Sequence, residues 1–298
     1  MKTALRVLLW LIMICLLAVL PSGAPLSSAF AESAASALPL DDSPAPLPDP
    51  AGYAADGTGY QDESITVRIK TLREYDTTIL VAYVTIQDAS QLRTAMAAKF
   101  GTSRDVPGSR LAKRVNAVFA INGDYFNFDN KGYIVRQGTL YRDNPREAAD
   151  VLLIDDQGNL NIIRDANSEK IAAFAGTVVN AFSFGPALVM DGQPMPITEN
   201  LQMASGKPTQ RMVIGQTGPL SYLCVATEGP ENPGSVGLTL EQTAALMAKL
   251  GCRTAYNLDG GSSSTMVLNN QKINALSSKK VRAICDILYF GTLVGNAE

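Results

Sequence analysis

Hydrophobic and polar residues alternate along many segments of the chain, and a period of two residues predicts β-strands. Residues 65–70 and 78–86 alternate in this way, and the polar stretch between them predicts a β-hairpin. A second hairpin is predicted where residues 151–154 and 160–163 flank a polar turn. The same pattern predicts further strands or strand pairs, at 116–121, 181–190, 210–215, 220–227, 254–258, 267–273 and 283–290.

Helical spacing of apolar residues is confined to shorter stretches, at 88–98, 109–114 and 168–175, and to a longer one after Thr239. Thr239 is a good N-cap, and Gln242 three residues later can complete a capping box. Gly251 stands where this helix would end on a left-handed residue. We therefore expect an α+β fold, with a mixed, mostly antiparallel β-sheet core flanked by helices in a single domain.

The N-terminal part of the chain differs from the rest in composition. Residues 1–31 have the features of a signal peptide, with basic Lys2 and Arg6, an apolar run at 8–20 and small residues around a cleavage site at 29–31. An uncleaved N-terminal anchor is the alternative, although the apolar run is short for a membrane span. Residues 32–63 are rich in Ala, Ser and Pro and predict a disordered linker. We expect the folded domain at 64–298 and a secreted or cell-envelope location.

The charge balance argues against nucleic acid as a partner. The chain has 25 Lys and Arg against 28 Asp and Glu, and removing residues 1–31 takes away two basic residues, which leaves 23 against 28 and a net charge of −5. An acidic chain has no electrostatic attraction to nucleic acid or to an anionic membrane. A membrane contact is expected only through an uncleaved signal segment.

The chain contains no histidine, which removes every mechanism that needs a histidine base. Acid–base chemistry would then fall to carboxylates, Lys, Tyr or Cys. Cys224, Cys252 and Cys285 lie in apolar contexts and are expected to be buried, with one disulfide and one free thiol as the alternative. No Cys-x-x-Cys pair and no histidine are present, so an ordinary zinc site is excluded.

A polar loop follows the predicted strand at 254–258. Asp259 is followed by Gly260 and Gly261, and hydroxyl side chains then occupy positions 262–265. Glycines allow a close backbone approach, and backbone N–H groups with hydroxyls can hold phosphate or sugar oxygens. A glycine–serine surface turn is the simpler alternative, but the apolar helix and strand that lead into this loop would hold it rigidly.

The stretch 237–266 resembles the signature of the phosphodiester glycosidase family, in which a G-x-L-T-L segment and a helix are followed by N-L-D-G-G-G-S-S-T-M. Ser262 stands where the family has a third glycine. Similar correspondences are seen at Asn122-Gly123, where Asp124 replaces a usual glycine, at 184–192, at Arg211 and at Arg282. Glu228 keeps the carboxylate of the family's D-G-R, but Pro230 replaces the arginine. The resemblance also points to Arg136 as a substrate-facing residue.

The resemblance implies hydrolysis of a sugar 1-phosphodiester at its anomeric C–O bond. An oxocarbenium-like transition state needs a nearby carboxylate, and a phosphate leaving group needs little protonation. We expect Asp259 and Glu228 to be the carboxylate pair, and Asn122 to orient a sugar hydroxyl. The residues expected to bind the rest of the substrate, its phosphate above all, are Arg211, Gly260, Gly261, Ser262 and Ser263, with Gly123 and Arg136 beside them. Tyr125 and Phe126 could stack on a sugar ring or lie in the core.

Two other functions remain open at this point. One is a metal-dependent phosphodiesterase that cleaves P–O, with Asp259, Glu228 and Asp124 on Ca²⁺ or Mg²⁺; no cofactor is otherwise expected. The other is a non-catalytic domain that binds cell-wall glycans. In each case the expected partner is a glycosyl phosphate or a cell-envelope polysaccharide.

Overall fold

The computed structural model describes residues 36–197, 205–275 and 281–295. Residues 35–298 form one compact unit. The predicted signal peptide lies outside the described residues. Within those residues, no helix has both the length and the apolar character that a membrane crossing requires.

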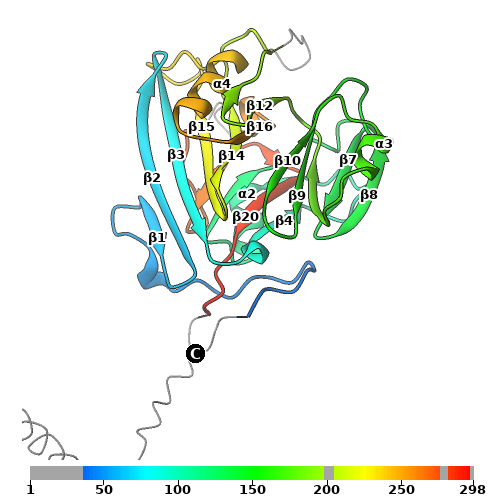
Figure 1. The fold of residues 1–298 in the computed structure, drawn as a ribbon. Coiled ribbons are helices and arrows are strands. Elements are labelled where there is room, and N and C mark those ends of the chain that lie inside the picture. Colours follow the sequence, from blue (N-terminus) through cyan, green and yellow to red (C-terminus); the bar gives the residue numbers. More distant parts are fainter. Residues whose placement is uncertain (1–35, 198–204, 276–280, 296–298) are drawn as a thin grey trace, which may run out of the picture. The chain divides into compact units, whose positions relative to one another are not determined.

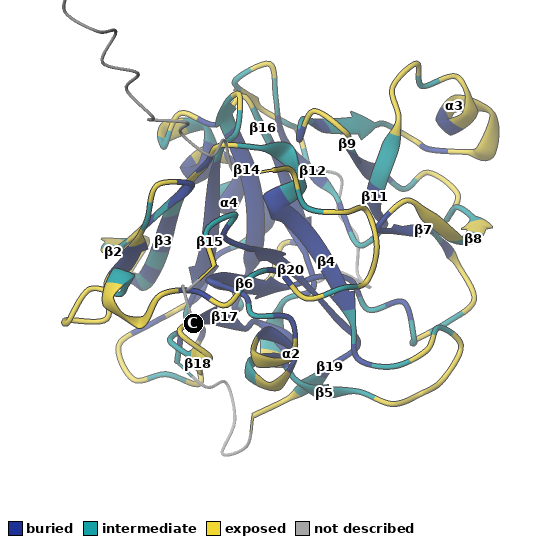
Figure 2. Ribbon diagram, turned by 90° about the horizontal axis from the view of Figure 1, so that it is seen from below, coloured by how far each residue is buried: buried dark blue, intermediate teal, exposed yellow. Residues whose placement is uncertain are grey.

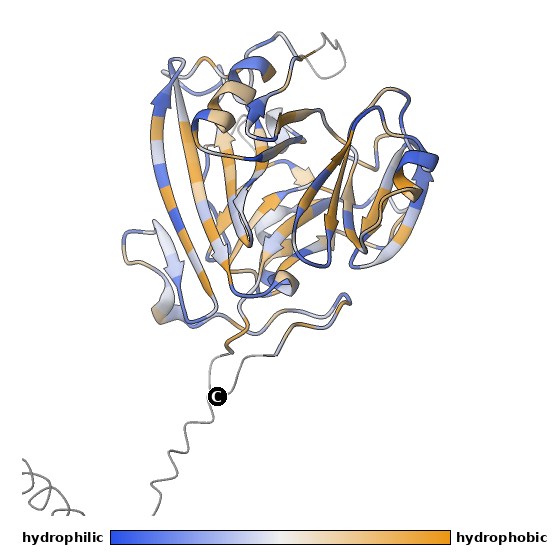
Figure 3. Cartoon of the chain, in the orientation of Figure 1, coloured by the Kyte–Doolittle hydropathy of each residue, from blue (hydrophilic) through white to orange (hydrophobic). Residues whose placement is uncertain are grey.

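The largest element is an eight-stranded antiparallel sheet. It contains the long hairpin that the alternating pattern at 65–70 and 78–86 predicted. One of its middle strands ends at position 258, directly before the polar loop. In Figure 3 the strand at Ile65–Glu74 alternates between hydrophilic and hydrophobic residues, whereas the strand at Thr77–Ile86 is mostly hydrophobic. Side chains on both faces of this second strand lie in hydrophobic clusters. In spatial order its strands are β1 (Gly59–Gln61), β2 (Ile65–Glu74), β3 (Thr77–Ile86), β15 (Ser221–Thr227), β14 (Met212–Gly218), β16 (Thr254–Leu258), β12 (Ala187–Met190) and β13 (Gln193–Pro194).

Two five-stranded antiparallel sheets and a two-stranded ribbon complete the β-structure of the described residues. One sheet has the order β10 (Leu160–Ile163), β9 (Val151–Asp155), β11 (Val178–Phe182), β7 (Gly132–Arg136) and β8 (Thr139–Asn144). The other has the order β18 (Gln271–Lys272), β17 (Met266–Leu268), β6 (Phe119–Asn122), β20 (Asp286–Phe290) and β4 (Leu92–Met96). The ribbon pairs β19 (Ala283–Ile284) with β5 (Val106–Pro107). In the view of Figure 1, β20 and β4 lie between β14 and β9.

The helices in the described part of the chain are few and short, so the fold is largely β and the expected α+β class is wrong in that respect. They are α2 (Gly108–Arg114), α3 (Ser168–Ala172) and α4 (Leu240–Lys249), with 3₁₀ turns at Pro50–Gly52, Ala89–Gln91 and Gly261–Ser263. Helix α4 has the predicted capping box between Thr239 and Gln242. The helix expected at 88–98 is instead a 3₁₀ turn followed by β4, because pairing with β20 overrides the local helical pattern.

One hydrophobic core is shared by the three large sheets. The inner face of the eight-stranded sheet packs against apolar residues of β6, β9 and β20. Helix α4 covers the opposite face of that sheet, and α2 packs on the sheet that contains β20. Figure 2 shows the central strands buried, while the loops around them are exposed. The strands that carry polar residues at their ends are therefore held rigidly by their apolar middles.

The described part of the expected linker, residues 36–63, is ordered, so that expectation is wrong for this segment. The guanidinium of Arg93, buried on β4, donates to the carbonyl oxygens of Pro39 and Asp41, each at 2.8 Å. Ala45 is buried, its N–H donates to the Val115 carbonyl, and its carbonyl accepts from Asn116 Nδ2. The composition of the segment suggested disorder, because composition gives no information about its hydrogen bonds with a distant arginine.

Candidate active site

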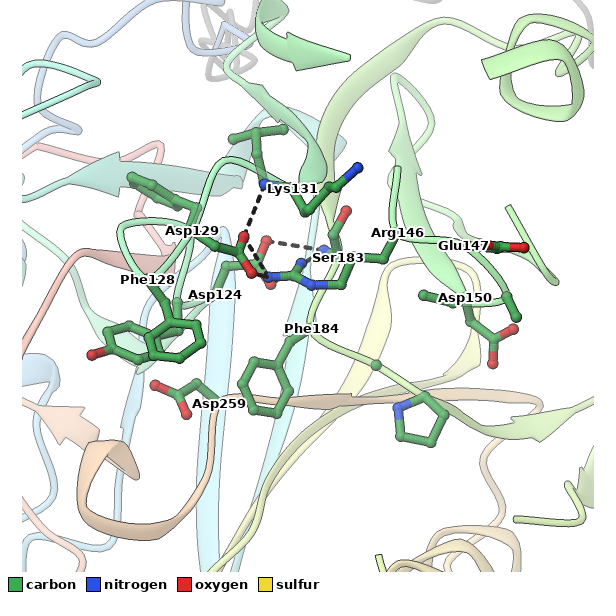
Figure 4. Close-up of a pocket in the computed structure, with 17 residues that line it drawn as sticks. Asp124, Phe128, Asp129, Lys131, Arg146, Glu147, Asp150, Ser183, Phe184 and Asp259 are labelled. Carbon is green, nitrogen blue, oxygen red and sulfur yellow. Dashed lines mark hydrogen bonds and ion pairs between the residues drawn. The ribbon is translucent and has the colours of Figure 1, made fainter. Parts of the chain in front are cut away.

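A cavity of about 700 Å³ opens where four connecting segments meet. These segments are the turn after β6, the loop between β8 and β9, the segment between β11 and β12, and the residue that follows β16. The cavity is lined by Asp124, Tyr125, Phe126, Phe128, Asp129, Lys131, Ile134, Arg146, Glu147, Ala148, Ala149, Asp150, Ser183, Phe184, Gly185, Pro186 and Asp259 (Figure 4). The lining thus combines aromatic rings with charged side chains, as a site for a polar small molecule requires.

Asp259 is the predicted site residue that lines this cavity. Leu258 still pairs with Met212, and the chain leaves the sheet at the next residue. The backbone of Asp259 is then held by the turn after β6, because its N–H donates to the Gly123 carbonyl (3.2 Å) and its carbonyl accepts from Asn122 Nδ2 (2.7 Å). The carboxyl group is therefore placed by two strands that belong to different sheets.

The carboxyl group of Asp259 is in an environment that disfavours its charge. The residue is 9% exposed, and burial raises its pKa to about 7, with the nearby Asp124 and Asp286 adding to the rise. A hydrogen bond from Ser263 and the charge of Arg282 act in the opposite direction. A carboxyl group that titrates near neutrality can serve as a base or nucleophile when ionised and as an acid when protonated.

Three charged side chains form a buried cluster, Asp124–Arg136–Asp286, of which Asp124 lines the cavity. Arg136 donates from Nε (2.9 Å) and Nη2 (2.5 Å) to Asp286 Oδ2, and its Nη2 lies 3.3 Å from Asp124 Oδ2. All three residues are less than 5% exposed. Burial raises the pKa of both carboxyl groups, and Arg136 opposes that rise. Asp124 also accepts from the Ser183 N–H (2.9 Å), so its carboxylate is fixed in the wall (Figure 4).

Two of the aromatic rings that line the cavity are stacked on each other. Tyr125 and Phe128 stack with ring centroids 5.4 Å apart and an interplanar angle of 26°. Phe128 is 71% exposed, whereas Phe126 between them is buried in a separate apolar cluster. In the view of Figure 4 the carboxyl group of Asp259 lies between the rings of Phe128 and Phe184.

Positive charge is available at the cavity and beside it. Arg146 lines the cavity and forms a two-bond ion pair with Asp129, at 2.9 and 3.0 Å. Arg282 is exposed, lies with its guanidinium 6.0 Å from the Tyr125 ring centroid, and is close enough to Asp259 to lower the pKa of that carboxyl group. An anion near Asp259 would thus meet at least one guanidinium.

Arg211 and Glu228 reach the same sheet edge as Asp259, but their side chains point to other partners. Strands β15 and β16 both pair antiparallel with β14, so they run in the same direction and end together. Arg211 Nε donates to the Leu238 carbonyl (3.0 Å), and its Nη2 donates to the Lys207 carbonyl (2.9 Å). The Glu228 carboxylate accepts from Ser235 Oγ (2.9 Å). Neither residue lines the cavity, so the expected pairing of Glu228 with Asp259 is not formed there.

The glycine loop, where we expect phosphate binding, also makes close contacts within the fold. The N–H of Gly261 donates to the Gln210 carbonyl (2.9 Å) and is therefore occupied. A Cβ on Gly260 would lie 2.7 Å from that same oxygen, which explains why this position must be glycine. Ser262 is exposed, while the buried Ser263 acts on the Asp259 carboxyl group. The loop therefore shapes the surroundings of Asp259.

Asn122, Gly123 and Arg136 also lie outside the cavity lining. Asn122 accepts from the Thr265 N–H (2.8 Å) as well as holding Asp259, so both polar atoms of its amide serve the loop. A Cβ on Gly123 would lie 2.6 Å from Asp286 Oδ1. These residues hold the loop and the buried cluster beside the cavity, and their direct contact with substrate stays a prediction.

Sequence reasoning missed Phe128, and it considered Asp124 only as a metal ligand in the alternative function. In the structure the carboxylate of Asp124 is buried and ion-paired with Arg136. The available signal was a carboxylate directly after an apolar strand, at a position where glycine is usual. Phe128 could have been found as an isolated aromatic within the polar run 127–130.

Other sequence expectations concern cysteines and metals. Cys224, Cys252 and Cys285 are buried free thiols, as expected, and the alternative disulfide is not formed. Among the described residues there is no group of three or more acidic or cysteine side chains arranged to hold a metal ion. The Glu228 carboxylate lies outside the cavity that holds Asp124 and Asp259, so these three residues do not share one site.

Comparison with known proteins matches residues 115–291 to the model of the phosphodiester glycosidase family. The SPβ prophage-derived uncharacterized protein YomE of Bacillus subtilis is 27% identical over 194 residues, which are 63% of this chain and 30% of that protein. The chain thus spans about a third of the length of this relative.

Two solved structures have a similar fold. The catalytic domain of zebrafish N-acetylglucosamine-1-phosphodiester α-N-acetylglucosaminidase, in a form auto-inhibited by its pro-peptide, matches with a TM-score of 0.63 and 18% identity, over 83% of this chain and 86% of that one. A hypothetical protein from Synechocystis matches with a TM-score of 0.52 and 16% identity, over 76% of this chain and 62% of that one. At these identities the two matches show the fold alone.

Proposed function

The chain belongs to the phosphodiester glycosidase family, and we propose that it is an exported hydrolase that cleaves the anomeric C–O bond of a sugar 1-phosphodiester. The observation that supports this most directly is the position of Asp259. Its carboxyl group is nearly buried at a cavity that also holds aromatic rings and arginine, and the pKa of this group is raised to about 7. Perturbed carboxyl groups in a cavity are frequent at catalytic sites.

The proposed reaction needs Asp259 in its ionised form. As the bond between the anomeric carbon and the phosphate oxygen breaks, positive charge develops on the sugar ring, and a carboxylate beside it stabilises that charge, attacks the carbon or activates water. The electron pair of the broken bond leaves with the phosphate oxygen, and water supplies the hydroxyl group of the free sugar. The other product is a phosphate monoester, which is a good leaving group without a strong acid. A carboxylate can thus support this reaction in a chain that lacks histidine.

We assign the phosphate to Arg282 rather than to Arg211. Arg282 is exposed and acts electrostatically on Asp259, whereas the Arg211 guanidinium is buried against backbone carbonyl groups. Guanidinium groups bind phosphate oxygens through paired hydrogen bonds. Cell-envelope glycosyl phosphates fit an exported enzyme, and export itself rests on the predicted signal peptide at 1–31.

The test is hydrolysis of methyl α-N-acetylglucosaminyl phosphate by the purified full-length protein and by Asp259→Asn. Loss of a catalytic carboxylate should lower kcat by about 10²–10⁴-fold, with circular dichroism confirming that the variant is folded. Glu228→Gln tests whether Glu228 acts together with Asp259 as a catalytic pair. Because Glu228 lies outside the cavity, we expect this variant to lower kcat by less than about tenfold. Glu241→Gln on the surface of α4 is the neutral control. A folded Asp259→Asn with undiminished turnover would contradict the proposal.

Two further readouts separate this reaction from its competitors. Hydrolysis in H₂¹⁸O should place the label on the sugar, whereas P–O cleavage by a metal-dependent phosphodiesterase would place it on the phosphate. Turnover should also survive EDTA. Binding of the diester without any turnover would favour a non-catalytic glycan-binding domain.

A further inference from the structure

Phe128 is a large apolar residue whose side chain is mostly exposed to solvent. Its side chain is 71% accessible, the largest value among the exposed large apolar residues of the described chain, and it lines the cavity that holds Asp259. We expect a bound ligand to cover the exposed face of this ring, because removing apolar surface from water lowers the free energy. The stacking of Phe128 on Tyr125 presents a flat aromatic surface of this kind.

The backbone that carries Phe128 is fixed on both sides. Asn127 Nδ2 donates to Asp105 Oδ1 (2.9 Å), and Asp129 holds Arg146 through two bonds. The Phe128 N–H also donates to the Tyr125 carbonyl (3.2 Å), which closes a tight turn. The ring therefore projects from a rigid turn, which lowers the entropy that binding would cost.

The ring pair stands beside both charged groups that the reaction needs. Tyr125 receives a hydrogen bond from Arg282 (3.4 Å), which is the proposed phosphate contact. Phe128 lines the same cavity as Asp259, and Figure 4 draws both side chains. A group in this cavity that covers the rings can therefore direct its reactive carbon toward Asp259 and its anionic substituent toward Arg282.

We propose that Phe128, stacked on Tyr125, is the platform for the sugar ring of the substrate, whose apolar C–H face lies on the aromatic surface. The inference rests on the proposed function and assigns the sugar subsite within it. A pyranose fits because it has one face of C–H groups and polar edges, whereas an extended polar chain would leave the rings exposed. The platform binds the ground state and the transition state alike, so its loss raises KM and spares kcat.

The kinetic test compares Phe128→Ala with Leu140→Ala, in which an exposed apolar residue outside the cavity lining is truncated. With methyl α-N-acetylglucosaminyl phosphate as substrate, Phe128→Ala should raise KM by about tenfold, with kcat within about twofold. Leu140→Ala should change neither constant. Phe128→Trp should restore the wild-type KM, which a purely structural role of the phenyl ring would not predict. An unchanged KM for Phe128→Ala overturns the platform.

A binding test separates the platform from the reaction. Trp10 is the single tryptophan of the chain, so a full-length Trp10→Phe, Phe128→Trp protein reports from position 128 alone. Its fluorescence should change on titration with N-acetylglucosamine 1-phosphate and stay constant with inorganic phosphate. Equal responses to both, or none to the sugar phosphate, contradict the platform. If the wild-type protein hydrolyses no phosphodiester while this titration succeeds, the proposed function fails and the sugar subsite stands.

Discussion

The cluster Asp124–Arg136–Asp286 and the turn that carries Asp259 are adjacent, buried and acidic, but they differ in how charge is compensated. Arg136 contacts both carboxylates of the cluster and donates to two backbone carbonyls as well. Asp259 has a serine hydroxyl as its neighbour and an exposed Arg282 at longer range. A buried carboxylate that is ion-paired is held in place by its partner, whereas one with weaker compensation can take up or release a proton near neutral pH. The comparison indicates that the cluster forms the wall and that Asp259 acts on the substrate.

The largest effect should come from removing the cation of the cluster. Arg136→Met leaves two carboxyl groups buried without a counter-charge, and breaking a buried pair in this way costs about 3–5 kcal/mol of unfolding free energy at pH 8. At pH 5 the loss should be smaller, because both carboxyl groups can then take up protons. Urea unfolding at the two pH values measures this, with Arg68→Met on the exposed side of β2 as the control. A loss that matches the control would show that the cluster is not a structural unit.

A smaller effect of opposite sign is expected at Asp259. Its folded-state pKa is raised from the ordinary 3.8 to about 7, so the unfolded chain ionises first and stability falls as pH rises from about 4 to about 7. Asp259→Asn removes this penalty and should stabilise the protein at pH 8 by about 1–4 kcal/mol, with little change at pH 4. The difference between wild-type and variant melting curves across this range isolates Asp259 from other titrating groups. A variant that is destabilised at pH 8 would mean that the carboxylate is compensated after all.

The smallest effect concerns the coupling between the two regions. Asp124→Asn keeps an acceptor for the Ser183 N–H but removes a negative charge that raises the pKa of Asp259. The pKa of Asp259 should fall. The rise of kcat/KM with pH, which we expect near pH 7 in the wild type, should then move to lower pH by less than about one unit. A pH–rate profile measures the shift. Movement to higher pH would show that Asp124 acts on Asp259 through something other than its charge.

Much of the fold could be predicted because it rests on local patterns. The alternation at 65–70 and 78–86 gave the hairpin β2–β3, and the capping box at Thr239 gave the start of α4. The segment 88–98 could not be predicted in this way, because its strand depends on pairing with β20 almost two hundred residues later. Long-range pairing has no local signal in a single sequence.

The site was predictable up to the ends of the strands. Asp259, Arg211 and Glu228 do come to one edge of the sheet, as their positions after or before apolar strands suggested. The direction of each side chain was not predictable, because it depends on the carbonyls and hydroxyls contributed by distant loops. Arg211 faces Leu238 and Lys207, and Glu228 faces Ser235. Asp124, which lines the cavity together with Asp259, instead follows a strand of another sheet.

The Arg93 guanidinium donates to three carbonyl groups within residues 39–43, which ties this segment to the folded domain. A protein cut at residue 64, where the regular pattern of strands begins, would lose these hydrogen bonds, expose the buried guanidinium to water and lose β1 from the edge of the largest sheet. The proline-rich composition thus indicates that this segment has no hydrophobic core of its own. The segment instead packs against the core that the strands of the domain form.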